Sequence, residues 1–299
     1  MKILLLGKNG QVGWELQRAL APVGTVVALD RGGADGLHGD LEDLDGIDRT
    51  VRSLAPDVIV NAAAYTAVDK AETDVERAQR INAEAPGVLA RAAATVGALL
   101  VHYSTDYVFD GGGDTPWREN APTAPLSVYG RSKLAGEEAI RAAGCRHLIL
   151  RTSWVYAARG GNFARTMLRL AAERDALTVI DDQVGAPTGA DLLADVTAHA
   201  LRSAMAQPGL AGLYHCAAAG ETSWYGYARF VIEAARAAGQ PVRVAPDAIR
   251  PIPTRAYPTA AQRPLNSRLA THKLQQAFGF VLPPWQRGVE RVLAEWFGA

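Results

Sequence analysis

The stretch KILLLGKNGQVG, residues 2–13, decides the fold. Its apolar beginning, residues 2–6, predicts a buried strand, and the glycines that follow are spaced Gly7-x-x-Gly10-x-x-Gly13. Glycine permits a tight turn and a close approach of the backbone to a diphosphate, and the N-terminus of the next helix supplies N–H donors and a positive dipole. The stretch therefore predicts dinucleotide binding. Its spacing differs from the commoner Gly-x-Gly-x-x-Gly, and an ordinary strand-to-helix turn is the alternative.

Short apolar runs and helical patterns alternate through the first half of the chain. Strands are predicted at residues 2–6, 25–29, 57–61, 99–103 and 147–150, and helices at 12–20, 74–96 and 128–142. Pro86 is expected to kink or divide the second helix. This alternation predicts an α/β fold, a doubly wound parallel sheet of the Rossmann type with helices on both faces.

The character of the sequence changes after Arg151, where tryptophan and proline become frequent and residues 241–267 read as loops and short extended pieces. We expect residues 1–151 to form the dinucleotide-binding domain. Residues 152–299 are expected to form mainly a smaller substrate domain, with segments around 177–216 packing back on the first sheet.

Composition excludes several classes of function. Among 299 residues, Lys plus Arg and Asp plus Glu both number 31, so no long-range field favours nucleic acid or an anionic membrane. The first apolar run is too short for a signal peptide. Cys145 and Cys216 are isolated and fit no metal spacing, which predicts reduced thiols in a cytoplasmic enzyme.

A candidate catalytic pair lies in the third predicted helix. Tyr129 and Lys133 are four residues apart and share one helical face. A phenol beside an ammonium group is expected to have a lowered pKa, which suits a proton donor to a carbonyl. Such a pair also arises often by chance on a surface helix, so its weight depends on the motifs around it.

Further candidate positions follow the predicted strands. Asp30 ends the second strand and suits hydrogen bonds from an adenosine ribose, whereas Arg31 suits a 2′-phosphate, so NADH and NADPH both remain open. Asp40 and Leu41 lie where an adenine pocket or a plain surface turn can form. The small residues after Asn61 permit close approach of a cofactor or simple close packing.

The run Ser104-Thr105-Asp106 follows the fourth apolar strand, at the carboxyl edge of the predicted sheet, where ligands bind. A hydroxyl group there can hydrogen-bond a substrate carbonyl. A turn or helix cap is the alternative interpretation of the same residues.

Taken in order, these motifs resemble the extended short-chain dehydrogenase/reductase family along most of the chain. The closest likeness is to the members that reduce a dTDP-linked 4-keto-6-deoxy sugar. It is carried by residues 7–13, 61–64, 104–111, 129 with 133, RTSWVY at 151–156, DQVGAPT at 182–188 and RPxNSxL at 263–269. The ordered set is far more specific than any one motif.

The resemblance implies reduction of the C4 keto group of dTDP-4-dehydro-L-rhamnose by NADPH or NADH. It implies that Tyr129 donates the proton, that Lys133 holds the nicotinamide ribose and lowers the tyrosine pKa, and that Thr105 orients the carbonyl. Asp106 and Trp154 would contact the sugar. The implied cofactor contacts are Gly7, Gly10, Gln11, Val12, Gly13, Asp30, Arg31, Asp40, Leu41, Ala62, Ala63, Ala64 and Tyr65, together with the catalytic pair.

Three residues of the proline-rich segment, Arg255, Arg263 and Asn266, are expected to grip the substrate diphosphate, because arginine forms bidentate contacts with such groups. Some family members are homodimers bridged by a divalent ion such as Mg²⁺, and others are monomers. Glu15, Asp191 and Glu295 are the acidic residues that would serve here. Their spacing defines no metal site, and solvated helix charges are the favoured interpretation.

Two rival functions remain at this point. A nucleotide-sugar epimerase or dehydratase on the same fold would keep an oxidised cofactor tightly bound through each cycle, whereas a reductase consumes NAD(P)H. A regulatory subunit would keep the fold and cofactor without turnover. The presence of Thr105, Tyr129 and Lys133 together argues against that second rival.

Overall fold

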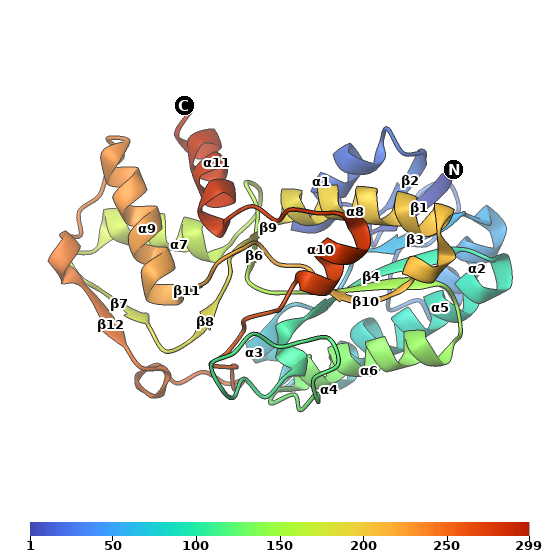
Figure 1. The fold of residues 1–299 in the computed structure, drawn as a ribbon, viewed down its shortest axis with the longest axis horizontal. Coiled ribbons are helices and arrows are strands. Elements are labelled where there is room, and N and C mark those ends of the chain that lie inside the picture. Colours follow the sequence, from blue (N-terminus) through green and yellow to red (C-terminus); the bar gives the residue numbers. More distant parts are fainter. Residues whose placement is uncertain (299) are drawn as a thin grey trace.

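The computed structural model describes residues 1–298, and in that range six parallel strands form the central sheet (Figure 1). The strands are β1 (Lys2–Leu6), β2 (Thr25–Leu29), β3 (Val58–Asn61), β4 (Leu99–Thr105), β5 (His147–Thr152) and β10 (Gly212–His215). Their order across the sheet is β10-β5-β4-β3-β1-β2. The predicted doubly wound α/β fold is confirmed, and the order reverses beside β1, where such sheets bind their ligands.

Helices cover both faces of this sheet. Two of them, α1 (Gln11–Leu20) and α8 (Ala190–Ala206), lie above it in Figure 1, and α2 (Leu44–Leu54), α5 (Ala85–Val96) and α6 (Val128–Ala142) lie on the other side. The alternation along β4 shows why both faces are needed. Val101 packs into the core on the α8 side, whereas Leu100 packs into the core on the α5 side.

The predicted helix at 74–96 is divided. It consists of α4 (Val75–Gln79), a π-helical turn over Arg80–Glu84 and α5, and a short α3 (Val68–Ala71) precedes it. The backbone stays helical from the π-helical turn into α5, and Pro86 is the second residue after that turn, so the predicted interruption at Pro86 takes the form of a change in hydrogen-bond pattern. Within that turn, Asn82 accepts the Tyr65 N–H (2.8 Å) and donates to the Ser132 hydroxyl (3.0 Å), which ties the turn to α6.

A second lobe lies beyond one end of the sheet (Figure 1). It is built on α7 (Phe163–Glu173), α9 (Trp224–Ala237) and α11 (Trp285–Phe297) with three short strand pairs, β6 (Val155–Tyr156) with β9 (Thr188–Gly189), β7 (Leu177–Ile180) with β12 (Ile249–Ile252), and β8 (Val184–Gly185) with β11 (Thr222–Ser223). The remaining α10 (His272–Phe278) packs beside β10.

The C-terminal half also contributes to the first lobe, since β10 extends the central sheet and α8 packs on α1. By contrast β7 pairs with β12 in the second lobe. The exact division at residue 151 stays a prediction. Over residues 1–298, the helices all fall short of the length and apolar character that a bilayer crossing requires.

Candidate active site

The turn after β1 depends on glycine at two positions. Gly7 has φ +85°, and a Cβ there would lie 2.7 Å from the Ala63 nitrogen. A Cβ on Gly13 would lie 2.0 Å from the Gly7 carbonyl oxygen. Gly10 precedes α1 as its N-cap residue, and Val12 lies in the first turn. Close backbone contacts therefore require glycine at both positions, and we call this tight turn before the helix N-terminus the glycine cradle, since such turns suit a bound diphosphate.

Polar groups after β2 lie beside this turn. The Asp30 carboxylate accepts hydrogen bonds from the Gly32 N–H (3.0 Å) and the Asn9 amide (2.9 Å), with the Lys8 ammonium at 3.5 Å. Against the opposing effect of desolvation, these groups hold the Asp30 pKa below its ordinary value. Arg31 is exposed with its guanidinium 3.9 Å from Asp40, at the rim of a hollow of about 300 Å³.

The segment after β3 closes the other side of the turn. Ala62 and Ala63 face Gly7 across the contact described above, and Ala64 is exposed. Tyr65 is buried, and its hydroxyl donates to Asp74 (3.1 Å). Leu41 is buried in the core below. The structure thus brings the predicted cofactor positions to one edge of the sheet.

The N-terminus of α6 positions the Tyr129 and Lys133 side chains. Ser127 caps the helix by accepting the Gly130 N–H at 3.1 Å. Tyr129 is half-buried and Lys133 is almost fully buried, with its Nζ donating to the Tyr103 carbonyl (2.7 Å) and lying 3.2 Å from His102 Nε2. Both residues lie on one helix, as predicted, and the contacts of Lys133 place this helix beside β4.

Burial dominates the proton affinities of this pair. It raises the Tyr129 pKa to about 12, with a further rise from the Asp106 charge and an opposing effect of the nearby Thr105 hydroxyl. It lowers the Lys133 pKa to about 8, against the charge of Glu137. The expected lowering of the tyrosine pKa by the lysine is therefore wrong for this structure, because the Lys133 Nζ is directed at Tyr103 and His102.

Thr105 and Asp106 lie at the carboxyl end of β4. The Thr105 hydroxyl donates to Asp106 Oδ1 (3.1 Å) and accepts the Tyr107 N–H (3.2 Å). Desolvation raises the Asp106 pKa to about 6. The Ser267 hydroxyl lies near enough to this carboxyl to oppose that rise, but among the described residues no group meets hydrogen-bond geometry with the buried Asp106 Oδ2. A buried acceptor left open beside a hydroxyl suits a polar ligand.

An aromatic pair lies in the second lobe, at residues 154 and 224. Trp154 has φ +49°, a strained conformation of the kind that clusters at functional sites. Its ring stacks on Trp224 with the ring centroids 3.7 Å apart, and Gly185 lies so close that a Cβ would contact the indole at 3.0 Å. The Trp224 Nε1 donates to Gln183 (3.0 Å). Sequence reasoning missed this stack, because Trp224 lies 70 residues from Trp154 in the chain.

Comparison with known proteins decides the family. The sequence-family model described as the RmlD substrate binding domain matches residues 1–297. The dTDP-4-dehydrorhamnose reductase of Escherichia coli K12 is 60% identical over 297 residues, which cover 99% of this chain and 98% of that protein. The chain belongs to the dTDP-4-dehydrorhamnose reductase family.

Solved members of the reductase family share the fold. The Clostridium acetobutylicum reductase has a TM-score of 0.89 at 34% identity, with 99% of each chain covered. The Bacillus anthracis reductase, solved in complex with NADP, has a TM-score of 0.86 at 33% identity, covering 98% of this chain and 99% of that one. The predicted membership is confirmed over the full length.

Two of the predicted diphosphate contacts of this family member are engaged elsewhere. Asn266 is buried, and its amide donates to the carbonyls of Gly112 (3.2 Å) and Thr115 (2.9 Å), so its role is to hold a loop. Arg263 forms a bidentate pair with Asp69 at 2.7 and 3.1 Å. Arg255 alone of the three is exposed. The sequence could not show these pairings, because the partners are distant in the chain.

The acidic residues considered for a dimer-bridging ion are also paired. Arg291 contacts Asp191 (2.9 Å) and Glu295 (3.5 Å), and Arg18 contacts Glu15 (3.5 Å). Within residues 1–298, no group of three or more His, Cys, Asp or Glu side chains is arranged to hold a metal ion. The arginines supply the positive charge at these carboxylates.

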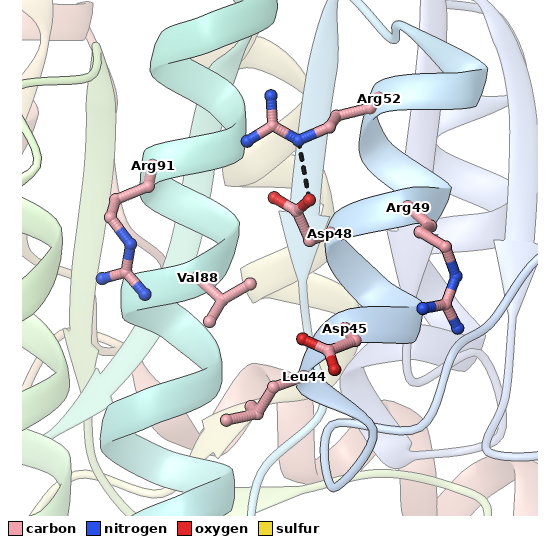
Figure 2. A pocket seen from close by; sticks show the side chains of 7 residues that line it. All are labelled: Leu44, Asp45, Asp48, Arg49, Arg52, Val88 and Arg91. Carbon is pink, nitrogen blue, oxygen red and sulfur yellow. Dashed lines mark hydrogen bonds and ion pairs between the residues drawn. The ribbon is translucent and has the colours of Figure 1, made fainter.

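A separate hollow lies between α2 and α5 (Figure 2). It has a volume of about 430 Å³ and is lined mainly by charged side chains, including the Asp48–Arg52 pair at 2.7 Å. Tyr129 and Lys133 lie on α6 and do not line it. This hollow is therefore distinct from the candidate active site of the reductase family.

Proposed function

We propose that this protein reduces the C4 keto group of dTDP-4-dehydro-L-rhamnose to give dTDP-L-rhamnose, with NADPH or NADH as the hydride source. The main support is the placement of Tyr129, Lys133 and Thr105 around the end of β4, next to the glycine cradle. The chain that carries them matches the reductase family along its length. This reaction is the last step of dTDP-rhamnose synthesis.

Two hydrogens must reach the carbonyl. The nicotinamide supplies a hydride to C4 when bound. Tyr129 would supply the proton to the carbonyl oxygen, because a phenol is protonated at neutral pH; burial raises its pKa to about 12 in the absence of ligands, so bound cofactor and substrate would have to lower that pKa for efficient transfer. The Thr105 hydroxyl lies close enough to influence that phenol and would orient the carbonyl between them.

Two neighbouring residues would contact the adenosine ribose of the cofactor. Asp30 would accept hydrogen bonds from an adenosine ribose, whereas exposed Arg31 would pair with a 2′-phosphate. The complex of the Bacillus anthracis relative with NADP supports use of NADPH. We expect both nicotinamides to be used, with a preference below about a hundredfold, or about 2.7 kcal/mol.

The sugar nucleotide would lie between the lobes, with Asp106 below it and Trp154 covering the apolar 6-deoxy face. Arg255 stays our proposed diphosphate contact, and Arg263 would contribute only if its pair with Asp69 opened. We also propose a cytoplasmic location, which the two buried free cysteines support. We further propose that the protein can form a homodimer, which light scattering would test.

The test is oxidation of each reduced nicotinamide by purified protein with dTDP-4-dehydro-L-rhamnose, followed by absorbance and by analysis of the sugar product. We expect one cofactor oxidised for each dTDP-L-rhamnose formed. An epimerase or dehydratase would convert the sugar without net oxidation of added cofactor. A regulatory subunit would bind NADPH and leave both compounds unchanged.

A further inference from the structure

His102 lies between the lysine of the proposed site and the end of β3. It is buried on β4, with its Nε2 3.2 Å from the Lys133 Nζ and its Nδ1 3.2 Å from the Asn61 amide nitrogen. Asn61 in turn accepts the Ala63 N–H through Oδ1 at 3.2 Å. Four groups therefore form one continuous chain from the cofactor-side backbone to the lysine.

The first hydrogen bond determines which group donates and which accepts in the others. Because Asn61 Oδ1 accepts the Ala63 N–H, the amide NH₂ faces His102 and must donate to Nδ1. A neutral imidazole has one donor and one acceptor, so its proton then lies on Nε2 and points at the Lys133 Nζ. The lysine meets that donor with a lone pair only as a neutral amine.

The reversed set of hydrogen bonds, with Lys133 as the donor to His102, leaves one contact unsatisfied. An ammonium group on Lys133 would donate to Nε2, which moves the imidazole proton to Nδ1, facing the Asn61 NH₂. Turning the amide relieves that contact but sets its NH₂ against the Ala63 N–H. Either way two buried donors face each other, and an unsatisfied buried donor costs about 1–3 kcal/mol.

We propose that His102 is a positioning residue for Lys133, which acts through the Ala63–Asn61–His102 chain to orient the lysine amine and to weaken its hold on a proton. The inference rests on the proposed function only for the part that Lys133 plays in the reaction. Under this proposal, residues at the ends of β3 and β4 control the protonation state of the Lys133 amine.

The charged and titratable neighbours are compatible with this assignment. On α6, Glu137 is held by Arg151 of β5 in a buried bidentate pair (2.7 and 2.8 Å), which limits its attraction for the lysine, and Tyr129 is protonated. On β4, the Tyr103 hydroxyl pairs with Thr197 (2.6 Å), and Asp106 lies at the Tyr129 side. Burial and the Lys133 charge hold the His102 pKa well below its ordinary range, so the imidazole stays neutral.

The experiment is a pH titration of protein labelled with carbon-13 at the lysine ε position, followed by NMR. The chain has five lysines, and the Lys133 resonance is the one lost in Lys133→Arg. The variants are His102→Gln, whose amide oxygen can turn toward an ammonium, and His102→Leu, which removes the donor. His147→Gln is the matched control, because this half-buried histidine of β5 contacts the Cys145 carbonyl and lies outside the chain.

We expect Lys133 of the wild type to titrate near pH 8 and to bind its proton about tenfold more tightly in both His102 variants, a shift of about one pH unit upward. His147→Gln should leave it unchanged. A downward shift in His102→Leu would show that His102 accepts from an ammonium, and it would overturn the proposal. So would no shift in either variant, or wild-type titration at the ordinary lysine value.

The titration needs no substrate, so it separates this inference from the proposed function. A protein without reductase activity that shows the predicted shifts would refute the proposed function alone. A reductase whose Lys133 resonance ignores His102 would refute the inference alone. Circular dichroism spectra and melting temperatures like those of the wild type show that each variant is folded.

Discussion

At the scale of single residues, removal of water sets the chemistry of the site. Desolvation penalises the charged form of every group, so it raises the pKa of Tyr129 to about 12 and lowers that of Lys133 to about 8. Both groups are thereby pushed toward their neutral forms. A neutral phenol keeps the proton that a carbonyl oxygen must receive.

The first prediction concerns that proton. Tyr129→Phe should fold and bind NADPH but turn over about 10²- to 10⁴-fold more slowly, the usual worth of a positioned acid. Steady-state kinetics and cofactor titration on the same preparation measure both quantities. Tyr107→Phe is a matched control, since this neighbouring ring packs edge-on against Tyr129 with the centroids 5.5 Å apart. Near-normal kcat in Tyr129→Phe would remove the tyrosine as the acid.

The second prediction concerns the Asp106 carboxyl. Its pKa is raised from 3.8 to about 6, so the stability it contributes is present below 3.8 and is lost as the pH rises through 6. The wild type then carries a penalty on the order of 3 kcal/mol at neutral pH. Asp106→Asn should therefore raise the free energy of unfolding at about pH 7.5, with a smaller gain at about pH 4.5, and should weaken sugar-nucleotide binding.

Denaturant unfolding at the two pH values measures this difference. Asp110→Asn is the control, because Asp110 is exposed and an asparagine keeps the acceptor for the Gly112 N–H, so its effect should stay within about 0.5 kcal/mol. An Asp106→Asn variant that is less stable at neutral pH, or equally stabilised at both pH values, would contradict the assignment of a buried carboxylate.

At the scale of elements, short segments of the second lobe present the aromatic surface. Trp154 lies just before β6 and Trp224 opens α9, and the two rings stack although the segments are distant in sequence. Gly185 of β8 leaves room for this stack. The positive φ of Trp154 turns its ring out of the strand direction, and it persists because the stack and the β6–β9 pairing hold it.

The third prediction follows from this stack. Trp154→Ala should reduce kcat/KM for the sugar nucleotide by about 2 to 4 kcal/mol, the scale of losing an aromatic anchor. NADPH binding should be almost unchanged, because the glycine cradle lies on the first lobe. Trp154→Phe should recover part of the loss. If cofactor affinity and Tm fall while sugar binding is unaffected, Trp154 is a core residue instead.

Elements differed in how well the sequence predicted them. The inner strands β1 and β3 are buried on both faces and appear as continuous apolar runs, and the glycine turn follows from steric needs that are local. The π-helical turn at Arg80–Glu84 and the two-residue strands carry no periodic signal. Likewise Arg263 and Asn266 look like free polar groups in sequence, and only tertiary contacts show that they are engaged.

At the scale of the whole molecule, contacts between the lobes frame the site on both sides. Gln11 of the glycine turn donates to the Gly161 carbonyl of the second lobe (2.9 Å). The Arg159 guanidinium carbon lies over the Trp14 ring, 3.5 Å from its centroid. On the other side Arg263 pairs with Asp69. In the proposed function, the first lobe would supply the cofactor cradle and the proton donor, while the second lobe would supply the aromatic cover.

The central claim is that a hydride passes from a nicotinamide on the first lobe to C4 of a sugar held by the second. It is tested most directly with NADPH carrying deuterium at the transferred position of the nicotinamide and dTDP-4-dehydro-L-rhamnose as acceptor, with mass spectrometry and NMR of the product. We predict dTDP-L-rhamnose with one deuterium at C4 for each NADPH oxidised, and slower formation of the same labelled product by Tyr129→Phe. A sugar product without deuterium, or conversion of the sugar without oxidation of NADPH, would contradict the account.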